Sequence, residues 1–123
     1  MKAIIDVKVR DLKRAIEFYT KKLGLRCRHE DKEWAAIKLG DAEIHLYLHA
    51  GITSGLEFYV EDLDRKVMNL KKRGVNFFSD KNMNNFISVD KNQITTFPWG
   101  RNAFFKDSEG NQLALVKDFE IVK

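Results

Sequence analysis

At 123 residues, of which 44% are hydrophobic and nine are Phe, the chain has the size and the core-forming residues of one globular domain, which excludes a disordered segment. The net charge of +4 comes from basic residues interleaved with acidic ones, and no apolar run approaches the roughly 18 residues of a membrane span, so neither a nucleic-acid partner nor a membrane partner is expected. Cys27 is the only cysteine, which excludes an internal disulfide and fits the reducing cytoplasm.

The first predicted elements are a strand that runs up to Asp11 and a helix that follows it. Apolar residues alternate before Asp11 and recur at helical spacing after it. The helical stripe consists of Leu12, Ile16, Tyr19 and Leu23. We expect Asp11 to cap the start of this helix and Gly24 to end it. Strands are then predicted near residues 26–30, 34–39 and 43–49, with a tight turn at Gly40-Asp41.

Residues 60–70 repeat the pattern of residues 9–19. The earlier segment reads V-R-D-L-K-R-A-I-E-F-Y and the later one reads V-E-D-L-D-R-K-V-M-N-L, so that Asp62 stands 51 residues after Asp11. Gly74 is expected to end the second helix as Gly24 ends the first. These matches predict two copies of one unit, a first repeat of about residues 1–50 and a second of about residues 54–118, within a single domain of residues 1–123.

The second repeat is distinct at its end and indistinct in its middle. Residues 101–106 and 111–117 alternate like strands on either side of the turn Asp107-Ser108-Glu109-Gly110. Residues 80–96 are polar and rich in Asn. This segment either carries one or two weak strands, near residues 86–89 and 93–97, or is a mobile loop that closes over a ligand.

The duplicated βαβββ unit and the two ends of the chain resemble the vicinal-oxygen-chelate superfamily, which includes glyoxalase I, bleomycin-resistance proteins and extradiol dioxygenases. The motifs that carry the resemblance are V-x-D-L-x-R-A-I-E-F-Y-x-x-x-L-G-L near the start and F-F-K-D-S-E-G-N-Q-L-A-L-V near the end. The resemblance covers nearly the whole chain. It implies an α+β fold in which two tandem βαβββ units form a curved mixed sheet around an open cleft, and it implies a homodimer.

The same resemblance also locates the metal ligands of the superfamily's metal-dependent members. These members place one ligand near the start of the first strand of each unit and one within its last strand. The matched motifs carry these positions to Ile4, Gly55, His45 and Ala114, of which only His45 can bind a metal. Because a divalent metal generally needs three or more protein ligands, we do not expect a metal centre of the glyoxalase I or dioxygenase kind, and the cofactor stays unknown.

Strand alternation predicts which side chains face the cleft, since residues two apart on a strand share a face. The apolar residues expected to pack under the helices are Ile5, Val7, Val9, Ile44, Leu46, Leu48, Leu56, Phe58 and Val60. On the final hairpin we expect Gln112 to share the cleft face with Phe105 and Arg101. The expected lining is aromatic at Trp34, Tyr47, Tyr59 and Phe105 and polar at Asp6, His45, Glu57, Arg101 and Gln112, and Glu43 is expected on the same side of its strand as His45. Such a mixture suits a small organic ligand.

Asp6, His45 and Glu57 are the candidate catalytic residues. Asp6 and Glu57 stand at equivalent positions of the two repeats, so two carboxylates are expected near His45, where they could act as a base, hold an unusual metal or bind a cation. The alternative is that they only form ion pairs with Lys8, Lys38 or Arg101. Imidazole titrates nearest to neutral pH, which makes His45 the leading acid-base candidate, although it could instead only form hydrogen bonds.

The sequence therefore leaves several functions open. The first is a metal-independent protein that sequesters an aromatic or anionic small molecule. The second is a lyase, isomerase or dioxygenase that uses His45 with Asp6 or Glu57, either without a metal or with an atypical one. A third is an interaction module with a vestigial cleft, which no feature of the sequence selects.

Overall fold

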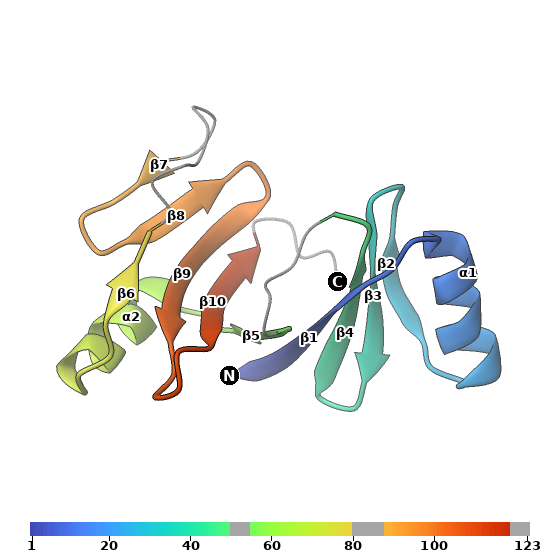
Figure 1. The fold of residues 1–123 in the computed structure, drawn as a ribbon, viewed down its shortest axis with the longest axis horizontal. Helices are drawn as coiled ribbons and strands as arrows, with labels where there is room; N and C mark the ends of the chain where they lie inside the picture. Colours follow the sequence, from blue (N-terminus) through green and yellow to red (C-terminus); the bar gives the residue numbers. More distant parts are fainter. Residues whose placement is uncertain (50–54, 80–87, 119–123) are drawn as a thin grey trace. The chain divides into compact units, whose positions relative to one another are not determined.

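The computed structural model describes residues 1–49, 55–79 and 88–118 (Figure 1). Contacts divide the chain into two compact units, residues 2–57 and the part that begins at Phe58. This division lies near the boundary predicted between the two repeats. Each unit has a helix, hydrogen-bonded strands and a buried apolar cluster of its own.

Strands of the first unit are ordered β2-β3-β4-β1, with β1 parallel to β4 and the other pairs antiparallel. The elements in chain order are β1 (Lys2–Lys8), α1 (Leu12–Glu17), the π-helical turn η1 (Phe18–Lys22), β2 (Cys27–Glu30), β3 (Trp34–Leu39) and β4 (Ala42–Tyr47). The connection permits this parallel pairing, because the chain between β1 and β4 passes through a helix and a hairpin and is long enough for a crossover.

Asp11 caps α1 as the sequence predicts. Its Oδ1 accepts a hydrogen bond of 3.0 Å from the backbone N–H of Arg14. The helix does not stay α-helical up to Gly24, however, because the N–H of Leu23 bonds to the carbonyl of Phe18, five residues earlier. Beside this turn, the Thr20 hydroxyl donates to the carbonyl of Ile16, an interaction that commonly bends helices. Gly24 then ends the segment with a φ of +75°.

The core of the first unit lies between α1 and strands β3 and β4. Its buried residues are Leu12, Ile16, Ala35, Ile37, Ile44 and Leu46, with Val7, Val9 and Leu48 packed against them. The prediction that Ile5 packs under the helix is wrong, because Ile5 is exposed. The physical reason is that α1 is short and packs on β3 and β4, which leaves Ile5 uncovered.

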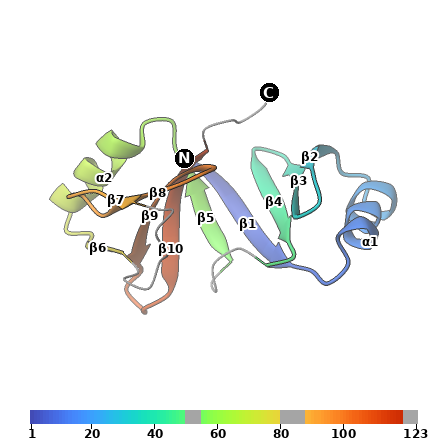
Figure 2. The same cartoon turned by 90° about the horizontal axis from the view of Figure 1, so that it is seen from above.

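The second unit pairs its strands in the order β10-β9-β8-β7, with β6 also paired to β9 and every one of these pairs antiparallel. Its elements are α2 (Leu63–Lys72), β6 (Phe77–Phe78), β7 (Ser88–Val89), β8 (Ile94–Phe97), β9 (Gly100–Lys106) and β10 (Gln112–Asp118). Strand β5 (Leu56–Tyr59) spans the boundary between the units. Figure 2 shows α1 and α2 each beside strands of its own unit.

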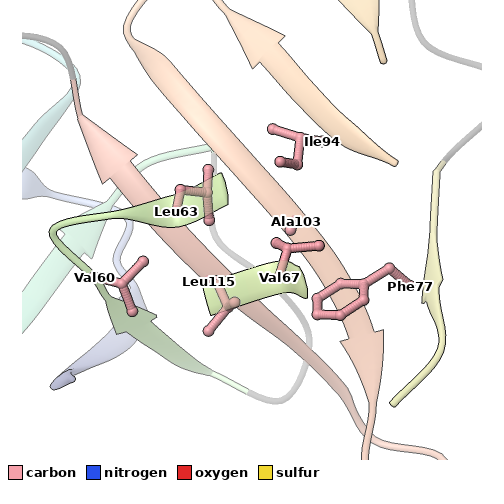
Figure 3. Close-up of a cluster of buried hydrophobic side chains, with 7 residues drawn as sticks. All are labelled: Val60, Leu63, Val67, Phe77, Ile94, Ala103 and Leu115. Atoms are coloured by element: carbon pink, nitrogen blue, oxygen red, sulfur yellow. The ribbon is translucent and has the colours of Figure 1, made fainter. Parts of the chain in front are cut away.

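A buried cluster joins α2 to its strands (Figure 3). Asp62 caps the helix through the N–H of Arg65, which directs Leu63 and Val67 toward the sheet. The cluster consists of Val60, Leu63, Val67, Phe77, Ile94, Ala103 and Leu115, with Phe58 packed against it as predicted. Two helices with mixed parallel and antiparallel strands confirm the α+β class.

Of the two readings of residues 80–96, the part from Ser88 onward is a pair of short strands. Strand β8 coincides closely with the strand predicted near residues 93–97, and β7 with the end of the one near residues 86–89. The predicted loop that would close over a ligand falls largely on residues 80–87, which lie outside the described residues.

Candidate functional site

His45 lies at the centre of a polar patch on the face of the first unit's strands that points away from α1. Alternation along β4 sends Ile44 and Leu46 into the core and sends Glu43, His45 and Tyr47 to the opposite face. Despite facing away from the core, the His45 side chain is buried, with only 3% of its surface exposed. The histidine is therefore shielded from solvent.

Both ring nitrogens of His45 have hydrogen-bond partners on the same strand. Nε2 lies 2.9 Å from Oε1 of Glu43, and Nδ1 lies 3.1 Å from the hydroxyl of Tyr47. An ionised carboxylate can only accept, so Nε2 carries the proton and donates it toward Glu43. With a neutral ring, Nδ1 then accepts a hydrogen bond from the Tyr47 hydroxyl. Glu43, His45 and Tyr47 form one continuous hydrogen-bonded chain.

Arg28 holds the far end of this chain. Its guanidinium donates through Nη2 to Oε1 of Glu43 at 2.8 Å and through Nε to Oε2, a bidentate pair in which both side chains are largely shielded from solvent. Lys38 Nζ lies 3.9 Å from the same carboxylate. Burial alone would raise the pKa of Glu43, but the hydrogen bonds and charges of His45 and Arg28 outweigh it and lower the pKa from 4.5 to about 2. Glu43 is thus ionised at neutral pH.

Trp34 forms an aromatic wall beside the hydrogen-bonded chain. The register of β3 and β4 pairs Trp34 with Tyr47, as the predicted hairpin requires. The two rings are nearly parallel, at 22°, with centroids 5.7 Å apart, and the Trp34 ring lies 4.9 Å from His45. His29 packs on the Trp34 ring at 4.6 Å and is hydrogen-bonded to Asp31.

Asp6 lies next to His45, and Glu57 is placed on the neighbouring strand β5. The parallel register of β1 and β4 pairs Asp6 with His45, so the prediction that a carboxylate stands near this histidine holds for Asp6. The N–H of Asp6 donates to the carbonyl of Gly55 at 2.7 Å. Gly55 has a φ of +79°, and a Cβ there would come within 3.1 Å of the Asp6 carbonyl oxygen, so a glycine is required at this contact. Glu57 is buried, and its role stays a prediction.

Arg101 and Phe105 do not share a face with Gln112. The β9-β10 register pairs Phe105 with Leu113 and Arg101 with Lys117, which places both on the helix side of the hairpin. Arg101 makes two hydrogen bonds, of 2.8 and 3.0 Å, to Asp64 of α2. The predicted face was wrong because a shift of one residue in register moves every side chain of a strand to the other face.

Phe105 and Tyr59 have partners within the second unit. The Phe105 ring packs against Phe77, with centroids 5.4 Å apart, at the edge of the α2 core. The hydroxyl of Tyr59 accepts a 2.9 Å hydrogen bond from Lys117. Gln112 is half-buried on the other face of the hairpin. Ligand binding by Tyr59, Gln112, Phe105 and Arg101 stays a prediction.

Sequence reasoning missed the importance of Glu43 and missed Arg28. Alternation along the strand does place Glu43 on the same face as His45. The two-residue spacing between Glu43 and His45 could therefore have indicated their hydrogen bond. Arg28 gave no such signal, because β2 has an irregularity between Cys27 and His29 that breaks the alternation of its side chains.

The family described as glyoxalase/bleomycin resistance protein/dioxygenase superfamily matches residues 4–115. The chain belongs to this superfamily. No curated protein sequence is similar to it, and no helix among the described residues is long and apolar enough to cross a membrane.

Several solved structures share the fold of this chain at low sequence identity. A superfamily member from Vibrio splendidus 12B01 is 12% identical, with a TM-score of 0.53, over 96% of this chain and 98% of that one. The methylmalonyl-CoA epimerase of Streptomyces coelicolor is 17% identical, with a TM-score of 0.57, over 94% and 95% of the two chains. A hypothetical protein of Bacillus halodurans C-125 is 16% identical, with a TM-score of 0.59, over 98% and 95%.

The four positions that the resemblance assigns to metal ligands, Ile4, Gly55, His45 and Ala114, do not carry a set of side chains that fits a metal. Ile4 and Ala114 are buried apolar residues, and Gly55 offers only its backbone. His45, the one possible ligand, already uses both ring nitrogens for hydrogen bonds. Among the described residues, no group of three or more His, Cys, Asp or Glu side chains is arranged to hold a metal ion. We therefore derive no chemical step through a metal.

Proposed function

We propose that this superfamily member binds an aromatic or anionic small molecule without a metal, on the face of its first unit that carries Trp34, His45 and Tyr47. One observation carries the proposal: a buried, fully hydrogen-bonded histidine lies beside a stacked Trp-Tyr pair. Small-molecule sites combine apolar aromatic surface with a few fixed polar groups in this way. Trp34 is part of that surface and can report on the ligand directly.

Tryptophan fluorescence tests the proposal, because the chain has only two Trp residues. In the Trp99→Phe variant the emission comes from Trp34 alone, and in the matched Trp34→Phe variant it comes from Trp99, which is exposed on the second unit. A panel of aromatic and anionic compounds is titrated into both variants and is also screened by thermal shift. Methylmalonyl-CoA belongs in the panel, because a structure similar in fold holds it.

We expect a compound that raises the melting temperature to change the emission of Trp34 and to leave that of Trp99 unchanged. No thermal shift with any compound, or a response confined to Trp99, would contradict the proposed site. The metal-independent form of the proposal further requires that the shift is the same in EDTA.

A second candidate function is a metal-independent lyase or isomerase. The side-chain hydrogen bonds that link Glu43, His45 and Tyr47 favour this function. A carboxylate that accepts the imidazole N–H orients a histidine for acid-base catalysis. The dioxygenase alternative receives no such support from these residues. Incubation of the panel's carbonyl compounds in D2O, followed by NMR, tests for enzyme-dependent exchange of a C–H proton.

A homodimer, which the superfamily implies, and a cytoplasmic location, which the cysteine content suggests, complete the proposal. We propose that the protein is a homodimer, which sedimentation velocity would test, with a purely monomeric species counting against it. The single Cys27, half-buried and without a disulfide partner, fits a location in the reducing cytoplasm.

A further inference from the structure

We propose that the hydroxyl of Tyr47, and not the ring of His45, exchanges protons with the ligand, and that Glu43 and Arg28 position the histidine behind it. This inference rests on the proposed function, in its lyase or isomerase form. It replaces the expectation that His45 itself meets the ligand. In this assignment Tyr47 is the catalytic residue, and His45, Glu43 and Arg28 are positioning residues.

Burial separates His45 from any ligand. Only 3% of the surface of His45 is exposed. Both ring nitrogens are already hydrogen-bonded, Nε2 to Glu43 and Nδ1 to Tyr47, so neither is available to a ligand. Trp34 covers the ring at a centroid distance of 4.9 Å. Tyr47, whose hydroxyl is bonded to Nδ1, is only half-buried. A ligand on this face therefore meets the phenol before it meets the imidazole.

The donors and acceptors in this series of side-chain hydrogen bonds fix which nitrogen of His45 carries the proton. Arg28 keeps Glu43 ionised, Glu43 accepts the proton-bearing Nε2 of His45, and the lone pair of Nδ1 accepts the Tyr47 O–H. His45 is thereby fixed in the tautomer that can take the phenolic proton. Without the carboxylate, the imidazole would be free to place its proton on Nδ1 and would then donate to Tyr47.

Proton transfer along this chain balances in protons and charge. The ligand gives a C–H or O–H proton to the oxygen of Tyr47, while the original phenolic proton moves to Nδ1 of His45. The ligand becomes an anion and His45 becomes an imidazolium, which the Glu43 carboxylate stabilises. Reversal of the two transfers returns a proton to the ligand, so no oxidant, metal or other co-reactant is consumed.

Nitrogen-15 NMR of the His45 ring tests the positioning step without any ligand. The wild-type protein is expected to show a protonated Nε2 and an unprotonated, hydrogen-bonded Nδ1. In Glu43→Gln the side-chain amide can either donate to or accept from Nε2, so a mixture of the two His45 tautomers is expected. In Tyr47→Phe the Nδ1 resonance is expected to move toward that of an imidazole nitrogen without a donor. A wild-type ring protonated on Nδ1 alone would overturn the inference.

Tyr47→Phe then tests the catalytic step, because it removes the hydroxyl and keeps the ring that stacks on Trp34. The probes are carbonyl compounds with an exchangeable C–H, methylmalonyl-CoA among them, followed by NMR in D2O. We expect the variant to retain the thermal shift and Trp34 response and to lose at least roughly 100-fold in exchange rate. The matched control is Tyr19→Phe, which removes a phenolic hydroxyl from η1 and should leave exchange unchanged.

Binding and proton exchange are separate measurements, so the role of Tyr47 can fail while the binding function stands. Binding by the wild type with equal exchange in Tyr47→Phe overturns the role of Tyr47 and leaves the binding function standing. Binding without any exchange in the wild type does the same. Failure of every probe to bind overturns both. Glu43→Gln is expected to slow exchange at saturating probe with little change in KM, and a change in KM alone would contradict its positioning role.

Discussion

Ionisation of Glu43 links the candidate site to the acid stability of the protein. Its pKa lies near 2 in the folded protein and near 4.5 when unperturbed, because the hydrogen bonds and charges of His45 and Arg28 outweigh its burial. A lowered pKa contributes stability that is fully present above pH 4.5 and is lost as the pH falls toward 2. The shift corresponds to at most about 3 kcal/mol.

We therefore predict that the free energy of unfolding decreases as the pH falls from 5 to 2.5, and that protonation of Glu43 accounts for part of this decrease. Urea unfolding of the wild type and of Glu43→Gln at several pH values would measure it. The variant should be less stable than the wild type at pH 6, since Arg28 loses a charged partner, and the gap should narrow toward pH 2.5. A gap that is constant over this range would contradict the assigned pKa.

The Thr95 hydroxyl in the second unit allows the cost of burying one unpaired polar atom to be measured. Its side chain is fully buried, and its Oγ1 has no hydrogen-bond partner among the described residues. An unpaired buried hydroxyl costs about 1–3 kcal/mol, so Thr95→Val, which keeps the shape, is expected to stabilise the protein by about 1 kcal/mol. The control is Thr96→Val on the opposite face of β8, where little change is expected. Thermal unfolding would measure both, and destabilisation by Thr95→Val would show that the hydroxyl has a partner.

At the residue scale, alternation identified the face of the site but not the interactions on it. His45, Tyr47 and Trp34 lie together as predicted, because a tight hairpin turn fixes the register of β3 and β4. The hydrogen-bonded chain could not be predicted, since it depends on side-chain rotamers. Arg28 was hidden by the irregular pairing of β2.

At the element scale, the starts and ends of the helices were predictable and their inner geometry was not. Asp11 and Asp62 cap α1 and α2, and Gly24 and Gly74 end their segments with positive φ, because these positions depend on local chemistry alone. The π-helical turn η1 has no comparable signal in the sequence. The predicted pairing in the final hairpin was wrong by one residue, because Asn111 belongs to the connection between the strands and β10 begins only at Gln112.

Pairing between α2 and β9 leads to a prediction for Arg101. Its bonds to Asp64 hold it on the helix side of the second unit, although Asp64 is more than half exposed. Pairs of this kind contribute about 0–1 kcal/mol. We predict that Arg101→Gln lowers stability by less than about 1 kcal/mol and leaves the thermal shift with a bound probe unchanged. A loss of ligand response in this variant would instead show that Arg101 takes part in ligand binding.

Across the whole molecule, the two repeats share a pattern of elements and differ in chemistry. In the first repeat, β4 presents Glu43, His45 and Tyr47 on one face. The corresponding last strand of the second repeat, β10, presents Gln112, Ala114 and Val116. Repeat positions that must be apolar for the core were retained in both, which is why the fold could be predicted. The functional positions diverged, so one repeat says little about the chemistry of the other.

The same divergence predicts the metal behaviour of the whole protein. Ile4, Gly55 and Ala114 offer no side-chain ligand, and a metal at His45 would have to displace Glu43 or Tyr47 from its ring. We expect less than stoichiometric Zn, Mn or Ni by elemental analysis after reconstitution and dialysis, and a melting temperature that EDTA does not change. His45→Ala separates specific from adventitious binding, because a metal bound at this site must be lost in the variant. One equivalent of metal in the wild type that is absent in His45→Ala would show that the hydrogen bonds of His45 open to form a metal site. The metal-independent function and the proposed proton transfer through Tyr47 and His45 would then both be wrong.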